Sequence, residues 1–303
     1  MSSARTLKST HATLPPFDEF YADLVSRNHH FVSREAQQRL KTFKILIAGC
    51  GSTGGACIEA LARAGVCRFW LADNGDYELS NLNRQHARIE NIGQNKAEFH
   101  AAEVKSINPY SQIFVATDGI TQKNVDEFVG PVDMVFDAVD VTTEAGIRAK
   151  VLLHQKCHAY KKPVLSGLDL GYLQWGCSFD YRQGSIDVLR GTAEAALAAK
   201  HPLVALFRIY PLQVLPGHAA PLIEDLMQNR CDFASQMGCT SDALSAVIVP
   251  AVLKFVEHGA LIPRWSVDLS SYRFSLQERL EWWWKGLLIK RKLSVLIRSN
   301  HLP

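Results

Sequence analysis

The 303-residue chain lacks several features that would assign it to a specialised class of protein. Its seven cysteines form no CxxC pair, so neither a disulfide framework nor a paired zinc site is expected, and thiols in a reducing compartment are the plain interpretation. No apolar run approaches the ~20 residues of a membrane span. The best candidate, 243–253, is too short and contains Pro250. The N-terminus has no apolar core of a signal peptide, and we expect a cytoplasmic protein.

Excess charge is also scarce, because the chain carries a formal net charge of only +3. Its 47% hydrophobic and 21% charged residues are values of an ordinary globular protein and exclude disorder as the main state. From Arg264 onward eight Lys/Arg residues face three Asp/Glu residues, so this end has a net charge of +5 and residues 1–263 carry −2. The body of the protein therefore has no concentrated basic face, and no nucleic-acid partner is expected for it.

Apolar segments alternate in a way that predicts an α/β fold. The expected strands are 44–48, 69–72, 112–116, 135–140 and 164–168, and the expected helices are 17–41, 53–64, 96–107 and 242–258. Antiparallel strands are expected over 170–183, whereas 190–240 shows no clear period. The pattern predicts a Rossmann-like, doubly wound, mostly parallel sheet that antiparallel strands continue, with a mobile arm over 1–16 and a helical tail at the C-terminus.

A glycine-rich turn follows the first expected strand. Gly49, Gly51 and Gly54 let the backbone turn tightly and approach a phosphate, whose charge then lies at a helix N-terminus. Asp73 ends the next strand, where a carboxylate accepts hydrogen bonds from a ribose. Together these features predict a nucleotide site. The alternative is a glycine turn that serves close packing alone.

Two cations and an acid make the prediction more specific. Arg84 lies in SNLNRQ and Lys96 ends GQNK, both shortly after Asp73. A dehydrogenase has no need of this pair, whereas an enzyme that breaks an α–β phosphate bond must neutralise a triphosphate. Asp140, which ends an expected strand on the same edge of the sheet, is a candidate Mg²⁺ ligand. Each residue alone also fits a solvated charge or a cap, but the set favours phosphate chemistry.

Taken in order, GCGSTGG, Asp73 with SNLNRQ, GQNK and DAVD resemble the adenylating superfamily of ubiquitin-activating enzymes and the ThiF, MoeB and HesA proteins. The resemblance covers roughly residues 20–180. It implies ATP·Mg²⁺ binding and adenylation of a carboxylate on a ubiquitin-like protein, a peptide or a small molecule, with release of pyrophosphate. An adenylation domain would then span 17–260, with a nucleotide-binding core at about 42–168 and a substrate-facing part at about 169–260.

The resemblance also implies roles for individual residues. It assigns the nucleotide to Gly49, Gly51, Gly54 and Asp73, the triphosphate to Asn81, Arg84 and Lys96, and Mg²⁺ to Asp140. In this family an N-terminal arginine enters the partner subunit's active site. Ser26-Arg27-Asn28 is similar to that segment, so the resemblance implies a homodimer in which Arg27 acts across the interface.

Departures from the family pattern limit these expectations. A second acid is often found where this chain has Gly75, and an Asn where it has Val141. The two CxxC zinc pairs common in the family are missing, so no structural zinc is expected. Candidates for a thioester-forming cysteine are Cys157, Cys177, Cys231 and Cys239; Cys177 fits a core position better, and Cys231 is the most plausible exposed thiol.

The segment 261–303 is expected to be a basic, Trp-rich tail. Leu276, Leu280, Trp283 and Leu287 recur on one face of a helix, beside a cluster of Lys and Arg. This composition suits a peripheral protein that contacts a membrane surface, or a protein that binds an acidic partner. The alternative is a terminal helix packed on its own domain or across a dimer.

Two other functions compete with an active adenylating enzyme. One is an inactive, nucleotide-binding partner subunit in a heterodimer, and the other is an NAD-dependent dehydrogenase that uses the same glycine turn. Retention of Arg84, Lys96 and Asp140 argues against the inactive subunit, and the Arg84 and Lys96 pair disfavours the dehydrogenase. Neither the substrate nor the acceptor that follows adenylation can be identified from the residues.

Overall fold

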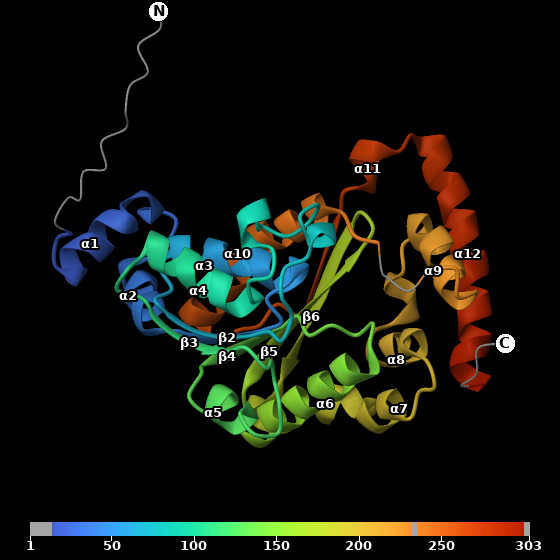
Figure 1. Cartoon of the computed structure of the whole chain (residues 1–303), viewed down its shortest axis with the longest axis horizontal. Coiled ribbons are helices and arrows are strands. Elements are labelled where there is room, and N and C mark those ends of the chain that lie inside the picture. Colours follow the sequence, from blue (N-terminus) through green and yellow to red (C-terminus); the bar gives the residue numbers. More distant parts are fainter. Residues whose placement is uncertain (1–13, 232–234, 300–303) are drawn as a thin grey trace, which may run out of the picture.

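The computed structural model describes residues 14–231 and 235–299, so most of the predicted N-terminal arm, residues 1–13, lies outside the described residues. One seven-stranded sheet runs through the molecule in the order β3-β2-β1-β4-β5-β6-β7 (Figure 1). The strands are β1 (Lys44–Ala48), β2 (Arg68–Ala72), β3 (Gln112–Ala116), β4 (Met134–Asp137), β5 (Pro163–Leu170), β6 (Leu173–Asp180) and β7 (Arg264–Asp268). The first five in chain order are parallel, and β6 and β7 pair antiparallel. This confirms the predicted fold class.

Helices cover both faces of the sheet. They are α1 (Phe17–Leu24), α2 (Arg34–Thr42), α3 (Ser52–Ala64), α4 (Lys96–Ile107), α5 (Val125–Val129), α6 (Glu144–Ala159), α7 (Ala193–Leu197), α8 (Pro202–Ile209), α9 (Ala220–Met227), α10 (Gly238–His258), α11 (Ser270–Arg273) and α12 (Leu276–Ser299). Short 3-10 turns are η1 (Ser26–Asn28), η2 (Leu79–Asn81), η3 (Ile89–Asn91), η4 (Tyr181–Gln183), η5 (Val188–Gly191), η6 (Leu212–Val214) and η7 (Gly217–Ala219).

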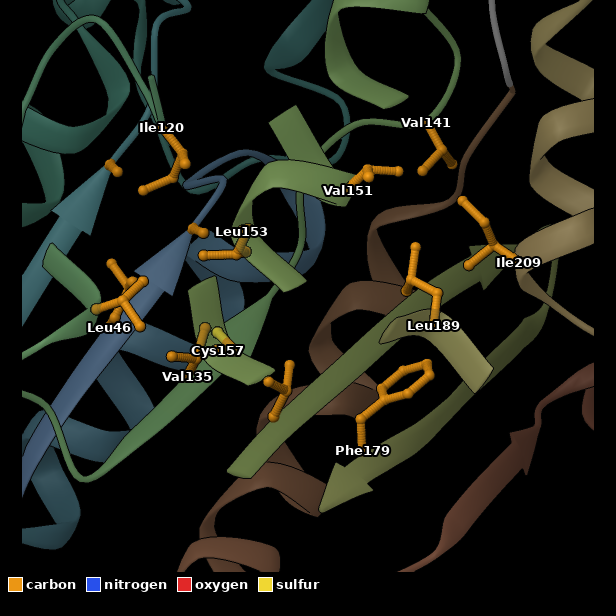
Figure 2. Packing of buried hydrophobic residues seen from close by; sticks show 14 of the residues in the cluster. Leu46, Ile120, Val135, Val141, Val151, Leu153, Cys157, Phe179, Leu189 and Ile209 are labelled. Atoms are coloured by element: carbon orange, nitrogen blue, oxygen red, sulfur yellow. The ribbon is translucent and has the colours of Figure 1, made fainter. Parts of the chain in front are cut away.

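The central strand β1 explains the two layers of core. Successive side chains of a strand point to opposite faces, so Ile45 and Ile47 pack with α2, α3, α4 and α10. Leu46 and Ala48 pack on the other face against α5, α6 and α8, the cluster drawn in Figure 2. A strand that is buried on both faces has a continuous run of apolar residues in its sequence. The run KILIA therefore allowed β1 to be predicted.

Two stretches differ from the sequence prediction. The helix expected over 17–41 is broken into α1, η1 and α2, and His30 between them has a positive φ of 74°, which no continuous helix contains. The unplaced stretch 190–240 contains α7, α8 and α9, whose five to eight residues are too short to show a clear period.

Helix α10 is longer than the predicted 242–258. Its 21 residues are long and apolar enough, by length and composition alone, to span a membrane. Its buried side chains, Leu244, Ile248 and Val252 among them, join the core cluster against α2 and α3. We therefore assign α10 to the core of the sheet domain.

The C-terminal segment contributes to the fold. Strand β7 pairs with β6, and α12 packs on α8 and α9 through Ile289, Leu293 and Leu296. A Cβ on Gly286 would lie 2.6 Å from the Cα of Gly217, so the two backbones cross closely. The tail thus packs on its own domain. The stripe members Leu276, Leu280 and Trp283 are exposed, so a different face of α12 packs on the domain.

Candidate nucleotide site at the carboxyl edge of the sheet

The glycine turn joins β1 to α3 at the carboxyl edge of the sheet. Gly49 has a φ of +88°, and a Cβ there would overlap the Ala138 carbonyl oxygen. A Cβ on Gly54 would overlap the carbonyl oxygen of Gly49. At Gly51 the nearest atom is 3.7 Å away, on the Gln85 side chain. Packing explains Gly49 and Gly54, whereas Gly51 leaves room in front of the helix N-terminus, as close approach of a ligand requires.

Asp73 follows β2 directly and braces the turn. Its Oδ2 accepts a 2.6 Å hydrogen bond from the Cys50 amide, and its Oδ1 accepts a 2.7 Å bond from the Gly75 amide. Burial raises the pKa of Asp73, and the two hydrogen bonds and the nearby Lys96 ammonium oppose that rise. Each oxygen keeps a lone pair for a further donor, as a ribose-binding carboxylate needs.

Lys96 begins α4, whose N-terminus is capped by Asn95. Its Nζ would lie 3.2 Å from a Cβ at Gly75, and it stands 5.9 Å from the centre of the Tyr77 ring. A side chain at position 75 would press on this ammonium group. Glycine at position 75, where the family often has an acid, therefore leaves space for the Lys96 side chain beside Asp73.

Arg84 is held on the loop after η2 by neutral acceptors. Its guanidinium donates to Ser80 O at 2.7 Å, to Asn83 Oδ1 at 2.9 Å and to Gln236 Oε1 at 2.9 Å. Because none of these partners is charged, the positive charge remains available to an anion. Buried Asn81 supports the loop by accepting the Glu78 amide at 3.2 Å.

A second buried amide lines the same turn. Gln85 Oε1 has no hydrogen-bond partner among the described residues, although its side chain is only 8% exposed and lies beside Gly51. Leaving a buried acceptor unsatisfied costs about 1–3 kcal/mol. An acceptor in this position fits a ligand that supplies a donor, such as a nucleotide hydroxyl or amino group.

Asp140 lies in a loop, and the strand expected over 135–140 ends earlier, at Asp137. The exposed Asp140 carboxylate accepts the Thr142 amide and hydroxyl, both at 2.8 Å. It is close enough to Asp73 for its charge to help raise the pKa of Asp73. The structure therefore gathers Asp73, Lys96 and Asp140 at one edge of the sheet.

The surroundings of Asp140 bear on the expected Mg²⁺. Within 14–231 and 235–299, no three His, Cys, Asp or Glu side chains cluster as a metal site. A solvent-accessible carboxylate fits the usual way of holding Mg²⁺, in which one or two carboxylates act together with substrate phosphates and water. Asp140 would therefore hold the ion only when a triphosphate completes its shell.

Arg27 lies far from this edge in its own chain. It is exposed on η1, and the adjacent Asn28 donates to the Ala64 carbonyl oxygen at the C-terminal end of α3. The glycine turn is at the opposite end of this 13-residue helix, a span of about 20 Å at 1.5 Å per residue. Arg27 can therefore serve a site of this kind only in a second copy of the chain.

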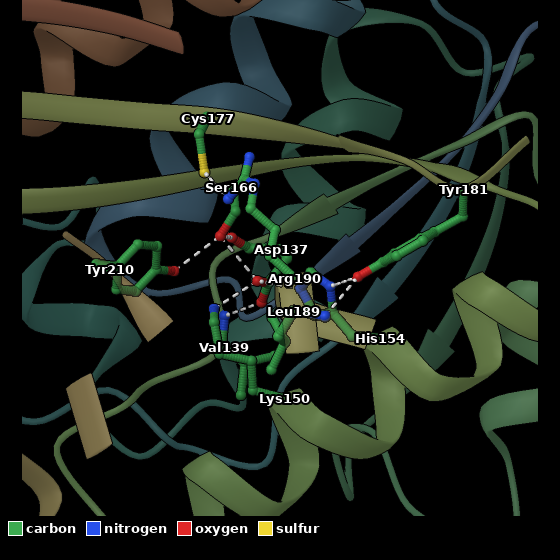
Figure 3. Close-up of polar contacts among 10 residues, drawn as sticks. All are labelled: Asp137, Val139, Lys150, His154, Ser166, Cys177, Tyr181, Leu189, Arg190 and Tyr210. Carbon is green, nitrogen blue, oxygen red and sulfur yellow. Dashed lines mark hydrogen bonds and ion pairs between the residues drawn. The ribbon is translucent and has the colours of Figure 1, made fainter. Parts of the chain in front are cut away.

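Sequence reasoning missed a buried polar network beneath the Asp140 loop (Figure 3). Lys150 and His154, one turn apart on α6, both contact the Asp137 carboxylate; the His154 Nε2 distance is 3.0 Å. Ser166 donates to the same oxygen at 2.8 Å. Burial alone would raise the pKa of Asp137, but Lys150 and His154 outweigh it and lower that pKa, so the carboxylate stays charged.

This network has a defined proton arrangement. Because the Asp137 carboxylate is charged and can only accept, the Nε2 of His154 carries the hydrogen of their bond. The Nδ1 of the neutral ring then accepts from the Tyr181 hydroxyl at 2.9 Å, and the oxygen of that hydroxyl accepts the Leu189 amide at 3.0 Å. Burial lowers the pKa of His154, which matches this neutral tautomer. Because Asp137 Oδ1 also accepts the Val139 amide at 3.2 Å, the network anchors the start of the loop that carries Asp140.

A cavity of about 470 Å³ opens beside the same edge. Val141, Thr142 and Asp169 form one side of it, and most of its remaining wall comes from residues 201–231 and Ser235. Part of the stretch that the sequence left unplaced thus faces the candidate nucleotide site.

The four cysteine candidates differ in accessibility. Cys157 and Cys177 are buried, and burial raises the pKa of both thiols, which disfavours the reactive thiolate. Cys177 is the core residue that the sequence indicated. Cys239 is exposed, whereas Cys231, expected to be the exposed thiol, is half-buried in the cavity wall.

Comparison with known proteins finds similarity both in sequence and in structure. The pattern of the ThiF family matches residues 25–180. HesA of Nostoc sp. is 31% identical over 221 residues, which cover 66% of this chain and 83% of HesA. The tRNA threonylcarbamoyladenosine dehydratase of Bacillus subtilis is 32% identical over 145 residues. The chain spans only 55% of that dehydratase, and 20% of a Mycobacterium tuberculosis relative that is 35% identical.

Solved structures share the fold at low sequence identity. PaaA superposes with a TM-score of 0.57 at 18% identity, covering 87% of this chain and 84% of PaaA. Escherichia coli MccB with ATP gives a TM-score of 0.56 at 17% identity, covering 78% of this chain and 63% of MccB. The E. coli dehydratase TcdA gives 0.54 at 24% identity, covering 79% and 95%.

Proposed function

Since the chain belongs to the ThiF family, we propose that it is an enzyme that uses ATP to adenylate a carboxylate and releases pyrophosphate. One observation carries the proposal. A glycine turn, a carboxylate suited to ribose, the Lys96 ammonium and an exposed acid meet at the carboxyl edge of the sheet, where α/β proteins bind their ligands. The backbone of Arg84 bonds to Ser52 at the start of α3, beside the same turn.

The reaction needs positioning and positive charge more than a protein nucleophile. A carboxylate oxygen attacks the α-phosphorus of ATP. The bond from that phosphorus to the bridging oxygen breaks, and pyrophosphate leaves with the electron pair. The product is an acyl-adenylate with a good leaving group. Negative charge grows on the departing phosphates, and fixed cations stabilise it.

The residues divide this work among themselves. Asp73 accepts ribose hydroxyls, and the space at Gly51 admits the phosphates to the N-terminus of α3. Lys96 supplies a point charge and Arg84 a planar fork of donors to the triphosphate. Asp140 would hold Mg²⁺, which supplies further neutralisation of phosphate charge.

The proposed enzyme is a homodimer. Arg27 lies at the far end of α3 from its own site, so its role in phosphate binding requires a second copy that presents it across the interface. The exposed Trp283, Trp284 and Lys285 on α12 stay available for the predicted contact with a membrane surface or an acidic partner. A cytoplasmic location stays a prediction.

The proposed substrate is a small molecule or a peptide. The sequence resemblance also allowed a ubiquitin-like protein, but that substrate is not retained. Relatives with a named activity are dehydratases of tRNA threonylcarbamoyladenosine, and none of the relatives described above is named for a ubiquitin-like protein.

Exchange of labelled pyrophosphate into ATP tests the proposal. The purified chain is mixed with ATP, Mg²⁺ and a panel of carboxylates, and carboxylate-dependent exchange is expected. If the chain binds ATP but catalyses no exchange, either without a carboxylate or with any carboxylate of the panel, the result would favour the inactive partner subunit. A gain in nicotinamide fluorescence on adding NADH would favour the dehydrogenase.

A further inference from the structure

The cavity beside the candidate nucleotide site has walls that adenylation alone does not require. One rim consists of Val141 and Thr142, which follow Asp140 directly, and of Asp169 near the end of β5. The volume of about 470 Å³ falls within the roughly 300–1,000 Å³ typical of small-molecule sites.

Hydrogen bonds connect this rim to the glycine turn. The Asp169 carboxylate accepts a 2.8 Å bond from the hydroxyl of Thr53 and a 3.1 Å bond from that of Ser241. Thr53 is the second residue of α3, immediately after the turn. Asp169 therefore connects the cavity wall directly to the start of α3, beside the place where the phosphates would lie.

Apolar side chains make most of the wall. Helices α8 and α9 contribute Leu203, Leu206, Leu222, Ile223 and Leu226. Such a wall stabilises an apolar ligand by about 25 cal/mol for each Å² removed from water.

The charged side chains in the wall already have partners. The Arg230 guanidinium donates to Asp225 at 2.8 Å. His201 Nδ1 accepts the Leu203 amide at 3.0 Å, and burial lowers the pKa of His201. Among the described residues, the wall thus offers little compensation to a charged ligand body, whose desolvation would be costly.

We infer that the substrate carboxylate is attached to an apolar body, either an alkyl chain or aliphatic amino-acid side chains, that occupies this cavity. The inference rests on the proposed function and names its substrate class. The carboxylate would lie at the rim near Asp140 and Thr142, and the apolar body would extend toward α9.

Pyrophosphate exchange with four carboxylates provides the test: acetate, glycylglycine, octanoate and N-acetyl-leucyl-leucine. We expect a KM at least about ten-fold lower for octanoate or the dileucine than for acetate and glycylglycine, since even one methylene in an apolar pocket is worth roughly ten-fold. The better of the two apolar probes distinguishes a free alkyl acid from a peptide.

Matched variants connect the preference to the cavity. Leu222→Trp narrows the cavity and should raise the KM for the preferred probe about ten-fold while the affinity for ATP stays unchanged. Leu288→Trp, the same change at a side chain 56% exposed on α12, should alter neither value. If Leu222→Trp fails to fold, Leu222→Ala enlarges the cavity and should shift the preference from octanoate toward decanoate.

The outcomes separate the inference from the proposed function. Equal KM values for acetate and octanoate, or no effect of either Leu222 variant, would overturn the inference and leave adenylation standing. If no carboxylate supports exchange, calorimetric titration with octanoate decides. If octanoate binds and Leu222→Trp weakens that binding, the apolar site is supported although the proposed adenylation is wrong. If octanoate does not bind, both the apolar site and the proposed function are wrong.

Discussion

The Lys150 ammonium group contacts the Asp137 carboxylate in the interior, where the two side chains are 1% and 0% exposed. Because neither charge reaches water, each depends on the other. Removing one partner of such a pair leaves a buried, uncompensated charge and typically costs about 3–5 kcal/mol. We expect Lys150→Met to lower the free energy of unfolding by that amount, as measured by urea denaturation.

A double change and a surface pair make this prediction specific. Asp137→Leu combined with Lys150→Met should recover part of the lost stability, because replacing both charges of a buried pair by apolar groups is often neutral. Lys156, also on α6, pairs with the exposed Asp126 at 2.7 Å. Lys156→Met should change stability little. Equal losses from the two lysine variants would contradict the argument.

This pair also marks the limit of what the sequence could predict. The glycine turn and Asp73 were predictable because their chemistry is local, with a strand, a turn and an acid at a fixed distance. Asp137 is three residues before Asp140, and VFDAVD alternates without showing where the strand ends. The partners of Asp137 come from α6, so only the folded chain reveals which of the two acids is buried and which is exposed.

The cavity could not be predicted from the sequence, for a related reason. Its walls come from α8 and α9, helices of eight residues each, and from strand ends far away in the chain. Short helices give no stable period, and their apolar residues look the same whether they fill a core or line a cavity. The fold class, by contrast, follows from short apolar strands that alternate with helices, and that pattern is visible in the sequence.

Asp140 is expected to be essential for catalysis and dispensable for folding. Its side chain is exposed and bonds only to Thr142 among the described residues, so Asp140→Ala should leave the unfolding midpoint nearly unchanged. Pyrophosphate exchange should fall at least about a hundred-fold, as is usual when a transition-state charge partner is lost. Asp187→Ala, at another exposed aspartate, serves as the control. Substantial exchange by Asp140→Ala would remove the proposed metal role.

Arg27 is expected to act across a dimer interface. Arg27→Ala and Asp140→Ala should each lack pyrophosphate exchange as separate homodimers. Co-expressed, they should recover roughly a quarter of wild-type exchange, because half of random dimers are mixed and one of their two sites is intact. Recovery would place Arg27 in the partner's site. If the co-expressed pair stays inactive although mixed dimers form, the role of Arg27 across the interface is wrong.

Stability should fall as the pH drops below neutrality, and His100 should contribute to that fall. Burial beneath α3 lowers the pKa of His100 to about 3, and its Nε2 lies 3.1 Å from the Tyr77 hydroxyl. An unfolded histidine titrates near 6.5, so between these values the unfolded chain binds a proton that the folded chain does not. The free energy of unfolding then decreases by about 1.4 kcal/mol for each pH unit of acidification.

The variant His100→Gln keeps a polar partner for Tyr77 but cannot titrate. Its unfolding free energy, measured in urea from pH 6.5 down to pH 5, should decline less steeply than that of the wild type, and the difference in slope should approach about 1.4 kcal/mol per pH unit near pH 5. His29→Gln changes an exposed side chain and should keep the wild-type slope. The lowered pKa of buried His154 acts in the same direction, so some decline should persist in His100→Gln. Identical slopes for wild type and His100→Gln would show that His100 is protonated in the folded chain.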